Sequence, residues 1–263
     1  MALATPIWRA TVLWLAPLFF FVGPGTALAA PATQAELVAY ADQNFQEAQA
    51  RHQKAPEDVA AAWQFGRACF DLAELVANKT QRASLAEQAI AACERAIARQ
   101  SNSAPAHYYL GMNVGELAQT KGLSALGLVK KMQREFTRAH DLDERLDWAG
   151  PDRSLGLLYR EAPSFGSIGS RSKARKHLQR AVELAPQYPE NGLNLLEAYL
   201  QWGDRKSAQR ELAALEQLWP SAHTNFTGIA WAASWAQWEP LLAKLKAKLS
   251  PPAKTLGAPH EKN

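Results

Sequence analysis

Two arginines have the residue type and the spacing that point most directly to binding chemistry in this sequence. Arg153 and Arg160 are seven positions apart, so on a helix they lie on one face, about two turns from each other. A guanidinium group can pair with a carboxylate through two parallel hydrogen bonds. The pair therefore predicts a site for an acidic peptide or an anionic ligand. The alternative is a pair of solvated surface arginines.

Residues that commonly carry out catalysis or bind metals are not grouped in this sequence. The histidines are dispersed, and no two of them have the helix-face spacing of metal ligands with a carboxylate between them. No serine lies in a Gly-x-Ser-x-Gly elbow, and no phosphate-binding loop of the Walker type is present. We therefore expect a protein that is not an enzyme and that holds neither a metal nor a cofactor.

A segment rich in glycine and serine, residues 166–173, runs into the basic start of a helix. Backbone N–H groups of such a loop can bind an anion. The simpler interpretation is a loop in which Ser170 or Ser172 caps the following helix. The absence of Walker spacing favours the cap.

Cys69 and Cys93 are the two cysteines of the chain. On the predicted helices they lie within one hairpin and face its interior, and an exported protein can oxidise such a pair to a disulfide. Free buried thiols are the alternative. We favour free thiols because a disulfide between two helices has demanding geometry.

A repeat between Pro151 and Pro220 predicts the elements that must position these residues. Three pairs of residues are 34 positions apart: Ala174 and Ala208, Leu178 and Leu212, and Pro186 and Pro220. A small residue, a large apolar residue and a closing proline at a fixed offset predict stacked helical hairpins. The small residues let two helices approach, the apolar residues fill the space between them, and the proline ends the helix.

This segment resembles the tetratricopeptide repeat, whose period is about 34 residues. The residues that match the family pattern in one repeat are Leu155, Gly156, Tyr159, Ala174, Leu178, Ala181 and Pro186. The resemblance implies an all-α, right-handed superhelical solenoid of helical hairpins with N- and C-terminal capping helices. It also implies that the first helix of each hairpin lines a concave groove.

Two narrower resemblances rest on the long, divergent repeats. Leu158-Tyr159-x-x-Ala162-Pro163, followed by a Gly-Ser loop and Lys173-Ala174, is similar to the regulator-of-microtubule-dynamics type of repeat protein. The same repeats are similar to the periplasmic T component of TRAP transporters, a tetratricopeptide-like protein that docks on a solute-binding subunit.

The first 29 residues have the pattern of a secretory signal peptide. Arg9 precedes an apolar run, 10–22, and Ala27-Leu28-Ala29 is a small-x-small cleavage signal. We expect cleavage after Ala29 and an exported protein, periplasmic or secreted. The alternative is an uncleaved membrane anchor, for which the apolar run is short. The expected segments are a signal peptide at 1–29, a helical domain at 30–249 with repeats at about 59–103, 104–148, 149–188 and 189–222, and a disordered tail at 250–263.

The residues after Pro220 are expected to form capping helices. Trp231, Trp235 and Trp238 lie on one face of a helix. They are expected to form either a cap over the last repeat or an aromatic platform for a ligand. A last helix, starting at Pro240, has leucines on one side and lysines beside them, and it can make weak contact with a membrane surface. The net charge of +4 is too small to indicate a nucleic-acid binder.

These observations predict an exported, non-catalytic scaffold that binds a protein or peptide, of acidic character, in its concave groove. The residues expected to be exposed in the groove are Gln64, Arg67, Tyr108, Asn113, Arg153, Arg160 and Asn194. The alternative is a small-molecule carrier or transport accessory protein, in which the hairpin insertions and the tryptophans enclose a ligand pocket.

Overall fold

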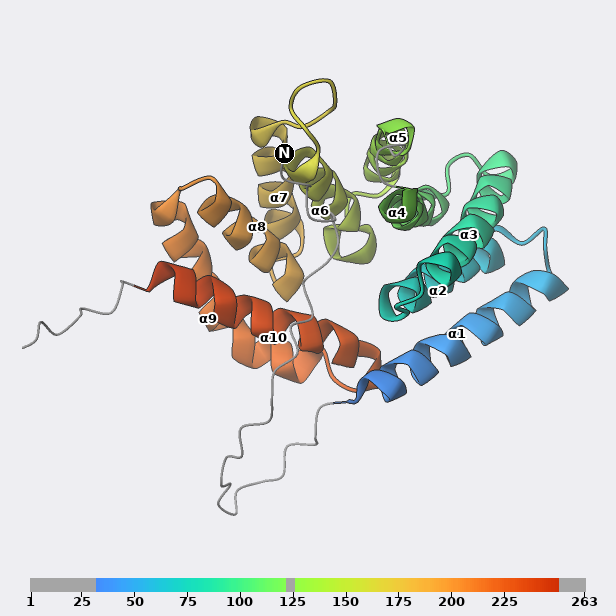
Figure 1. Ribbon diagram of the computed structural model, residues 1–263, viewed down its shortest axis with the longest axis horizontal. Helices are drawn as coiled ribbons and strands as arrows, with labels where there is room; N and C mark the ends of the chain where they lie inside the picture. Colours follow the sequence, from blue (N-terminus) through green and yellow to red (C-terminus); the bar gives the residue numbers. More distant parts are fainter. Residues whose placement is uncertain (1–31, 122–125, 251–263) are drawn as a thin grey trace, which may run out of the picture.

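The computed structural model describes residues 32–121 and 126–250 of the chain. Over these ranges the chain forms ten α-helices and no β-strand, which confirms the predicted all-α class (Figure 1). The helices are α1 (Gln34–Lys54), α2 (Val59–Leu75), α3 (Lys79–Arg99), α4 (Ala104–Lys121), α5 (Leu126–Leu142), α6 (Leu146–Glu161), α7 (Arg171–Leu184), α8 (Pro189–Gln201), α9 (Arg205–Asn225) and α10 (Ile229–Leu249). The predicted signal peptide lies outside the described residues, and so does the predicted tail from residue 251 onward.

Eight of these helices pair in sequence as hairpins: α2 with α3, α4 with α5, α6 with α7, and α8 with α9. The first helices of successive hairpins are neighbours, because α2 contacts α4, α4 contacts α6, and α6 contacts α8. Figure 1 shows the hairpins following one another along a curved path. The surface formed by α2, α4, α6 and α8 is called the concave face below.

Side-chain caps define where several of these helices begin. Thr33 and Glu36 form a capping box at α1, and Asp58 and Asn78 cap α2 and α3. At α7 the hydroxyl of Ser170 accepts a hydrogen bond from the Lys173 N–H at 3.4 Å. The glycine- and serine-rich loop therefore ends in a serine cap, as favoured from the sequence.

Glycines in the first helices allow each hairpin to close tightly. A Cβ atom on Gly66 would lie 2.5 Å from the Cys93 sulfur, and one on Gly156 would lie 2.7 Å from Leu178 Cγ. Both contacts join the first helix of a hairpin to its second. In the last hairpin Leu196 occupies the place of the usual glycine, and Gly192, one turn earlier, approaches Leu215 instead.

The repeat residues chosen from the sequence lie in the core as predicted. Tyr159 is buried, and Ala174 is fully buried in the same apolar cluster as Leu155 and Leu158. This confirms the register in which Tyr159 packs between hairpins and Ala174 lies at a close contact between helices.

Cys69 and Cys93 lie on α2 and α3, the two helices of one hairpin, and both are completely buried. They are free thiols in the structure. Burial raises the pKa of Cys93 to about 12 and raises the pKa of Cys69 as well. Neither thiol therefore has thiolate character, which is the form that reacts.

Two prolines lie inside helices, whereas Pro220 was predicted to end a helix and Pro240 to start one. Pro220 lies inside α9, which continues to Asn225, and Pro240 lies inside α10, which begins at Ile229. Both prolines are exposed, so the carbonyl group that loses its helical partner can be solvated by water. The tryptophans and the leucines that we had expected on two helices consequently lie on one.

The two ends of the helical stack meet. The last helix, α10, packs on α8 and α9 and also contacts α1 (Figure 1). A shallow hollow of about 440 Å³ lies at this junction, lined by Ala32, Glu36, Ala39, Tyr40, Gln43 and Ile229. The N- and C-terminal capping helices therefore contact each other as well as the repeats that they cover.

The apolar side of α10 is not available to a membrane. Trp238, Leu242, Leu245 and Leu249 are buried in the core cluster formed with α8 and α9. The leucines of this helix therefore complete the core and cannot make the membrane contact predicted for it, while Lys244 and Lys248 beside them are exposed. None of the described helices is long and apolar enough to cross a bilayer.

Candidate functional site

The most unusual backbone in the described chain is a left-handed turn that precedes the regular part of α6. Asp147, Trp148 and Ala149 have φ angles of 50°, 58° and 62°. Residues with a Cβ atom rarely adopt this conformation, and each costs about 1 kcal/mol or more. Three such residues in a row persist only where surrounding contacts hold them, and strained backbone of this kind is concentrated at functional sites.

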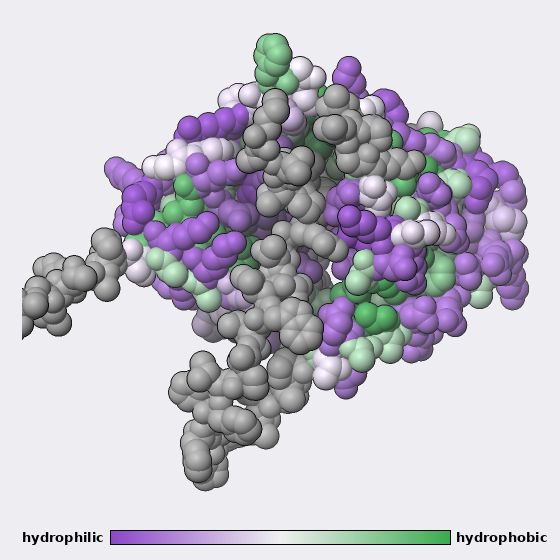
Figure 2. Space-filling view, in the orientation of Figure 1, coloured by the Kyte–Doolittle hydropathy of each residue, from purple (hydrophilic) through white to green (hydrophobic). Residues whose placement is uncertain are grey.

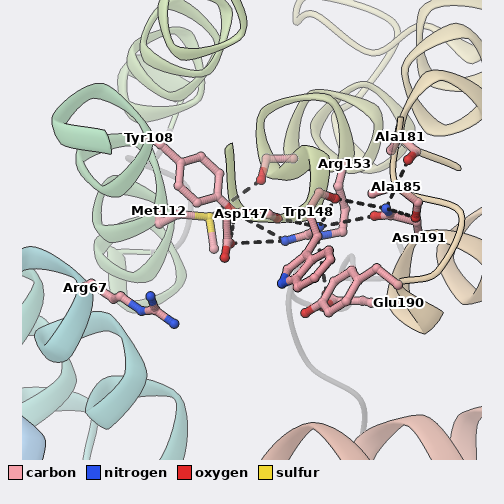
Figure 3. A network of polar contacts seen from close by, with 12 residues as sticks. Arg67, Tyr108, Met112, Asp147, Trp148, Arg153, Ala181, Ala185, Glu190 and Asn191 are labelled. Atoms are coloured by element: carbon pink, nitrogen blue, oxygen red, sulfur yellow. Dashed lines mark hydrogen bonds and ion pairs between the residues drawn. The ribbon is translucent and has the colours of Figure 1, made fainter. Parts of the chain in front are cut away.

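Arg153 is the hub that holds this turn (Figure 3). One of its terminal nitrogens donates to the carbonyl groups of Asp147 and Trp148 at 3.3 and 3.2 Å and to Asn191 Oδ1 at 3.2 Å. The other donates to Asp147 Oδ2 and to the Tyr108 hydroxyl, each at 3.4 Å. The side chain is 7% exposed, so these partners, and not water, compensate its charge.

Neighbouring hairpins contribute to the same network. Tyr108, on α4, donates from its hydroxyl to Asp147 Oδ2 at 3.0 Å. Asn191, on α8, donates to the Trp148 carbonyl at 3.0 Å and to two carbonyl groups of the preceding hairpin. Burial by itself lowers the pKa of Arg153. The nearby Glu190, Tyr108, Tyr188 and Asp147 raise it by more, so the pKa is raised overall. The turn thus joins α4, α6 and α8.

An aromatic wall continues from this turn to α10. Trp148 stacks on Tyr188 with ring centres 5.7 Å apart, and Phe226 and Trp231 pack beside them. The Arg153 guanidinium lies 5.1 Å from the centre of the Tyr188 ring, a cation–π distance. Trp231, Trp235 and Trp238 all pack on this core cluster, which favours the cap over a ligand platform.

A second buried charge network joins the first two hairpins. Arg82, on α3, donates to the carboxylate of Glu116, on α4, and to Gln119 Oε1 at 3.1 Å. Glu116 is completely buried, and Glu74 lies 3.9 Å from Arg82. Burial first, and then the neighbouring Glu116, raise the pKa of Glu74 well above its usual range.

Four partly exposed carboxylates remain around these networks. Asp71 and Glu74 lie on α2, Asp147 in the strained turn and Glu190 on α8, and their side chains are 49%, 24%, 28% and 35% exposed. They influence one another: Glu190 raises the pKa of Glu74, and Asp147 raises the pKa of Asp71. At Asp71 the largest cause is desolvation by the surrounding protein atoms, which act on the carboxyl group although half of its side-chain surface is exposed, and its pKa is raised to about 6 although Arg67 opposes the shift. Carboxylates of several hairpins therefore face a common space.

The exposure predicted for the groove residues is wrong for most of them. Tyr108 and Asn113 are fully buried, and Arg153 and Asn194 are almost so. Tyr108, Asn113 and Arg153 are buried because their side chains connect hairpins; Asn113, for example, donates to the carbonyl groups of Gly66 and Tyr109. Gln64 is half-buried.

The two other arginines of this prediction differ from each other. Arg160 keeps 7% of its side-chain surface, and it donates to Glu161 and to the Asn194 carbonyl and pairs with Glu197 at 3.2 Å. Arg67 is 54% exposed and has one loose partner, Asp71, at 3.6 Å. Of the predicted arginines, Arg67 alone therefore offers donors to a partner.

Sequence reasoning missed the strained turn and the carboxylates. The Gly150-Pro151 pair marks a turn ahead of a helix, and it was the available signal for a boundary. Gly150 is required there, since a Cβ atom would lie 2.5 Å from the Tyr108 hydroxyl. Nothing in the sequence Asp147-Trp148-Ala149 signals left-handed backbone.

Comparisons with known proteins agree with this architecture. The sequence profile of the family described as regulator of microtubule dynamics protein 1-3 matches residues 33–147, which is less than half of the chain and ends in the strained turn. This agrees with one of the two narrower resemblances predicted from the sequence. A search of curated proteins found no significant match.

Solved structures show the fold. TTC0263, a thermophilic TPR protein of Thermus thermophilus, is 16% identical, covers 82% of this chain and 99% of its own, and has a TM-score of 0.53. MamA is 17% identical over 70% of this chain and 91% of its own, with a TM-score of 0.49. YrrB, a TPR protein, is 18% identical over 78% of this chain and 90% of its own, with a TM-score of 0.45. The chain is thus a divergent repeat protein with a tetratricopeptide-like fold.

Proposed function

We propose that this protein is an exported, non-catalytic scaffold that binds a protein or peptide partner on its concave face. The observation that carries the proposal is the strained turn, where α6 and α8 bond the backbone of residues 147–148 and Tyr108 of α4 bonds the Asp147 carboxylate. Such strain is retained where a particular surface is needed, and here it fixes the positions of Asp147 and Trp148. Stacked hairpins suit such a function because they present an extended, preformed surface.

The charges of this face favour a cationic segment of the partner. The sequence predicted an acidic partner on the strength of Arg153 and Arg160, but the donors of both arginines are used within the protein. The acceptors that retain solvent exposure are carboxylates: Asp71, Glu74, Asp147 and Glu190. A Lys- or Arg-rich segment would complement them, since opposite potentials steer partners and set register.

The test is binding of short peptides graded in net charge, measured by fluorescence anisotropy. We expect basic peptides to bind more tightly than acidic ones of equal length. The double substitution Asp71→Asn with Glu190→Gln should weaken that binding about tenfold, since each partly exposed ion pair contributes up to about 1 kcal/mol. A matched control, Glu183→Gln with Glu239→Gln, removes two exposed carboxylates from second and capping helices and should change little.

Two outcomes would contradict this assignment. Tighter binding of acidic peptides would reverse the sign of the partner's charge. Equal weakening by the control pair would mean that net charge, and not the concave face, decides the affinity.

Binding of a cationic peptide should also depend on pH through Asp71. Its pKa of about 6 in the folded protein is above its usual value, so the carboxyl group is largely protonated at pH 5 and ionised at pH 7.5. A cation binds the ionised form, so affinity should strengthen from pH 5 to pH 7.5. The Asp71→Asn variant should lose part of this change, and the remainder belongs to Glu74, the other carboxyl group of this face whose pKa is raised. A variant that retained the full pH dependence would show that another group titrates in this window.

The alternative predicted from the sequence, a small-molecule carrier, would use a different place. A hollow of about 580 Å³ is lined by residues of α3, α4 and α5, and none of the four carboxylates of the concave face is among them. Its polar residues include His107 and Glu135, joined at 2.8 Å, and cationic side chains at its rim. Native mass spectrometry of protein from its own host would favour the carrier if a small ligand were retained, and the scaffold if a protein co-purified.

A further inference from the structure

We propose that the edge of the molecule formed by the α6–α7 loop, the start of α9 and the end of α10 docks on an anionic membrane surface, with Phe165 as its inserted side chain. This edge is called the basic edge below. It is distinct from the concave face, so the proposal does not depend on the partner bound there.

Phe165 is the most unusual exposed residue in the described chain. Its side chain is 97% exposed, whereas Ile229, the other large apolar residue noted as exposed, is 40% exposed. Figure 1 shows the loop between α6 and α7 standing clear of the helices, and Figure 2 shows an apolar group projecting at the position of that loop. A phenylalanine that packs on nothing contributes nothing to the stability of the fold, and it gains free energy wherever an apolar phase is available.

The base of this loop is firmly held. The Gly169 N–H donates to the Pro163 carbonyl at 3.0 Å, and the Ser170 N–H donates to the Tyr159 carbonyl at 2.9 Å. A Cβ atom on Gly169 would lie 2.0 Å from the Ala162 carbonyl oxygen, and Ile168 packs against the core. The loop therefore presents Phe165 from a fixed support.

Cationic side chains extend from the base of the loop along neighbouring elements. The exposed ones are Arg171, Lys173, Lys176, Arg205, Lys206 and Lys248. Contacts place them on neighbouring elements: Arg171 donates to the Trp202 carbonyl at 3.2 Å, and Arg205 donates to the Leu249 carbonyl at 3.1 Å. The start of α7, the α8–α9 turn and the end of α10 are thus adjacent.

The nearby acids do not neutralise these cations. Asp204 caps α9 and accepts hydrogen bonds from Arg175, and Glu161 is paired with Arg160. Among the residues that the structure describes, none of the four lysines of the basic edge pairs with a carboxylate. The edge therefore keeps an excess of free positive charge.

An apolar side chain on a fixed loop, on the same edge as cations that no carboxylate neutralises, fits the surface of an anionic bilayer. Each Lys or Arg near such a surface gains from the negative potential, and an inserted aromatic ring adds apolar transfer free energy. The loop tip between Ser164 and Ser167 carries small residues around Phe165. It offers no polar side chain of the length needed to read a base edge, so a membrane is favoured over a nucleic acid.

The test uses an environment-sensitive fluorophore on Phe165→Cys in the full chain. The buried native thiols have raised pKa values and should not react, so labelling should be selective. Labelled protein is mixed with vesicles of phosphatidylcholine alone or with added phosphatidylserine. We expect a blue shift and an intensity increase with the anionic vesicles at low salt, and a loss of both as salt is raised. The matched control is the same label on Glu183→Cys, which is exposed near the other end of α7 and should not respond.

Sedimentation with the same vesicles measures the contribution of charge and of the ring. Lys173→Gln with Lys206→Gln should weaken binding about tenfold or more, and Phe165→Ser about tenfold. Sedimentation without a response at position 165 would show that another segment binds, and would overturn the proposal. Absence of binding, or stronger binding to a DNA duplex than to vesicles, would also overturn it. Peptide binding on the concave face should be unchanged in these variants, so the two proposals can fail separately.

Discussion

Replacing Arg153 with methionine should lower the free energy of unfolding by about 3–5 kcal/mol, because it leaves buried partners of a charge without their donor. Methionine retains much of the volume but none of the hydrogen bonds to Asp147, Trp148 and Asn191. The left-handed turn would then have to persist without the group that holds it. Denaturant unfolding followed by circular dichroism would measure the loss.

Two further variants make this result specific. Arg67→Met, on the same face but 54% exposed, should change stability by no more than about 0.5 kcal/mol. Adding Asp147→Asn to Arg153→Met should recover part of the loss, since it removes the carboxylate that the first change leaves unpaired. If Arg153→Met were as stable as Arg67→Met, the network would not be what holds the turn.

Replacing Gly156 with valine should be the most damaging change in the repeat core, at about 3 kcal/mol. The first added carbon would already lie 2.7–2.8 Å from two side-chain carbons of Leu178 and 3.1 Å from its backbone nitrogen. A flexible side chain can move aside, but a backbone atom of α7 moves only with its helix. Thermal unfolding should therefore show a clear drop in Tm.

Gly127→Val provides a matched control for this overpacking. Gly127 lies on α5, and nothing is within 4 Å of the position that its Cβ atom would occupy. Both variants make the same chemical change within a helix, so the difference between them isolates the contact with Leu178. Equal melting temperatures would show that α6 and α7 do not pack in this register.

If both proposals hold, the protein is bound to a membrane through its basic edge while its concave face remains accessible to a partner. The basic edge would hold the solenoid, and the carboxylates of the first helices would remain open to a cationic partner. Each surface can be altered without touching the other, since Phe165 lies in the α6–α7 loop and Lys206 at the start of α9, while Asp71 and Glu190 lie on helices of the concave face.

The sequence determined the repeat because the information for it is local. Gly156 and Leu178 lie in a hairpin of consecutive elements, so their size pattern predicts close helix packing without knowledge of the rest of the chain. Ser170 caps its own helix through a residue three positions away, and such a cap is likewise visible in the sequence. Tyr159 and Ala174 were predicted to be buried for the same reason.

Which polar side chains are bonded within the protein, and which are available to a partner, depends on the tertiary structure. Arg153 looks like a surface ligand in the sequence, but its partners come from Tyr108 and Asn191, which are 45 and 38 positions away. The left-handed turn exists because those distant groups stabilise it, and the contact of α1 with α10 exists because the stack curves back on itself. Local spacing encodes the helix packing that every hairpin shares, whereas hydrogen bonds between hairpins depend on how the hairpins are rotated against one another, which no short pattern in the sequence specifies.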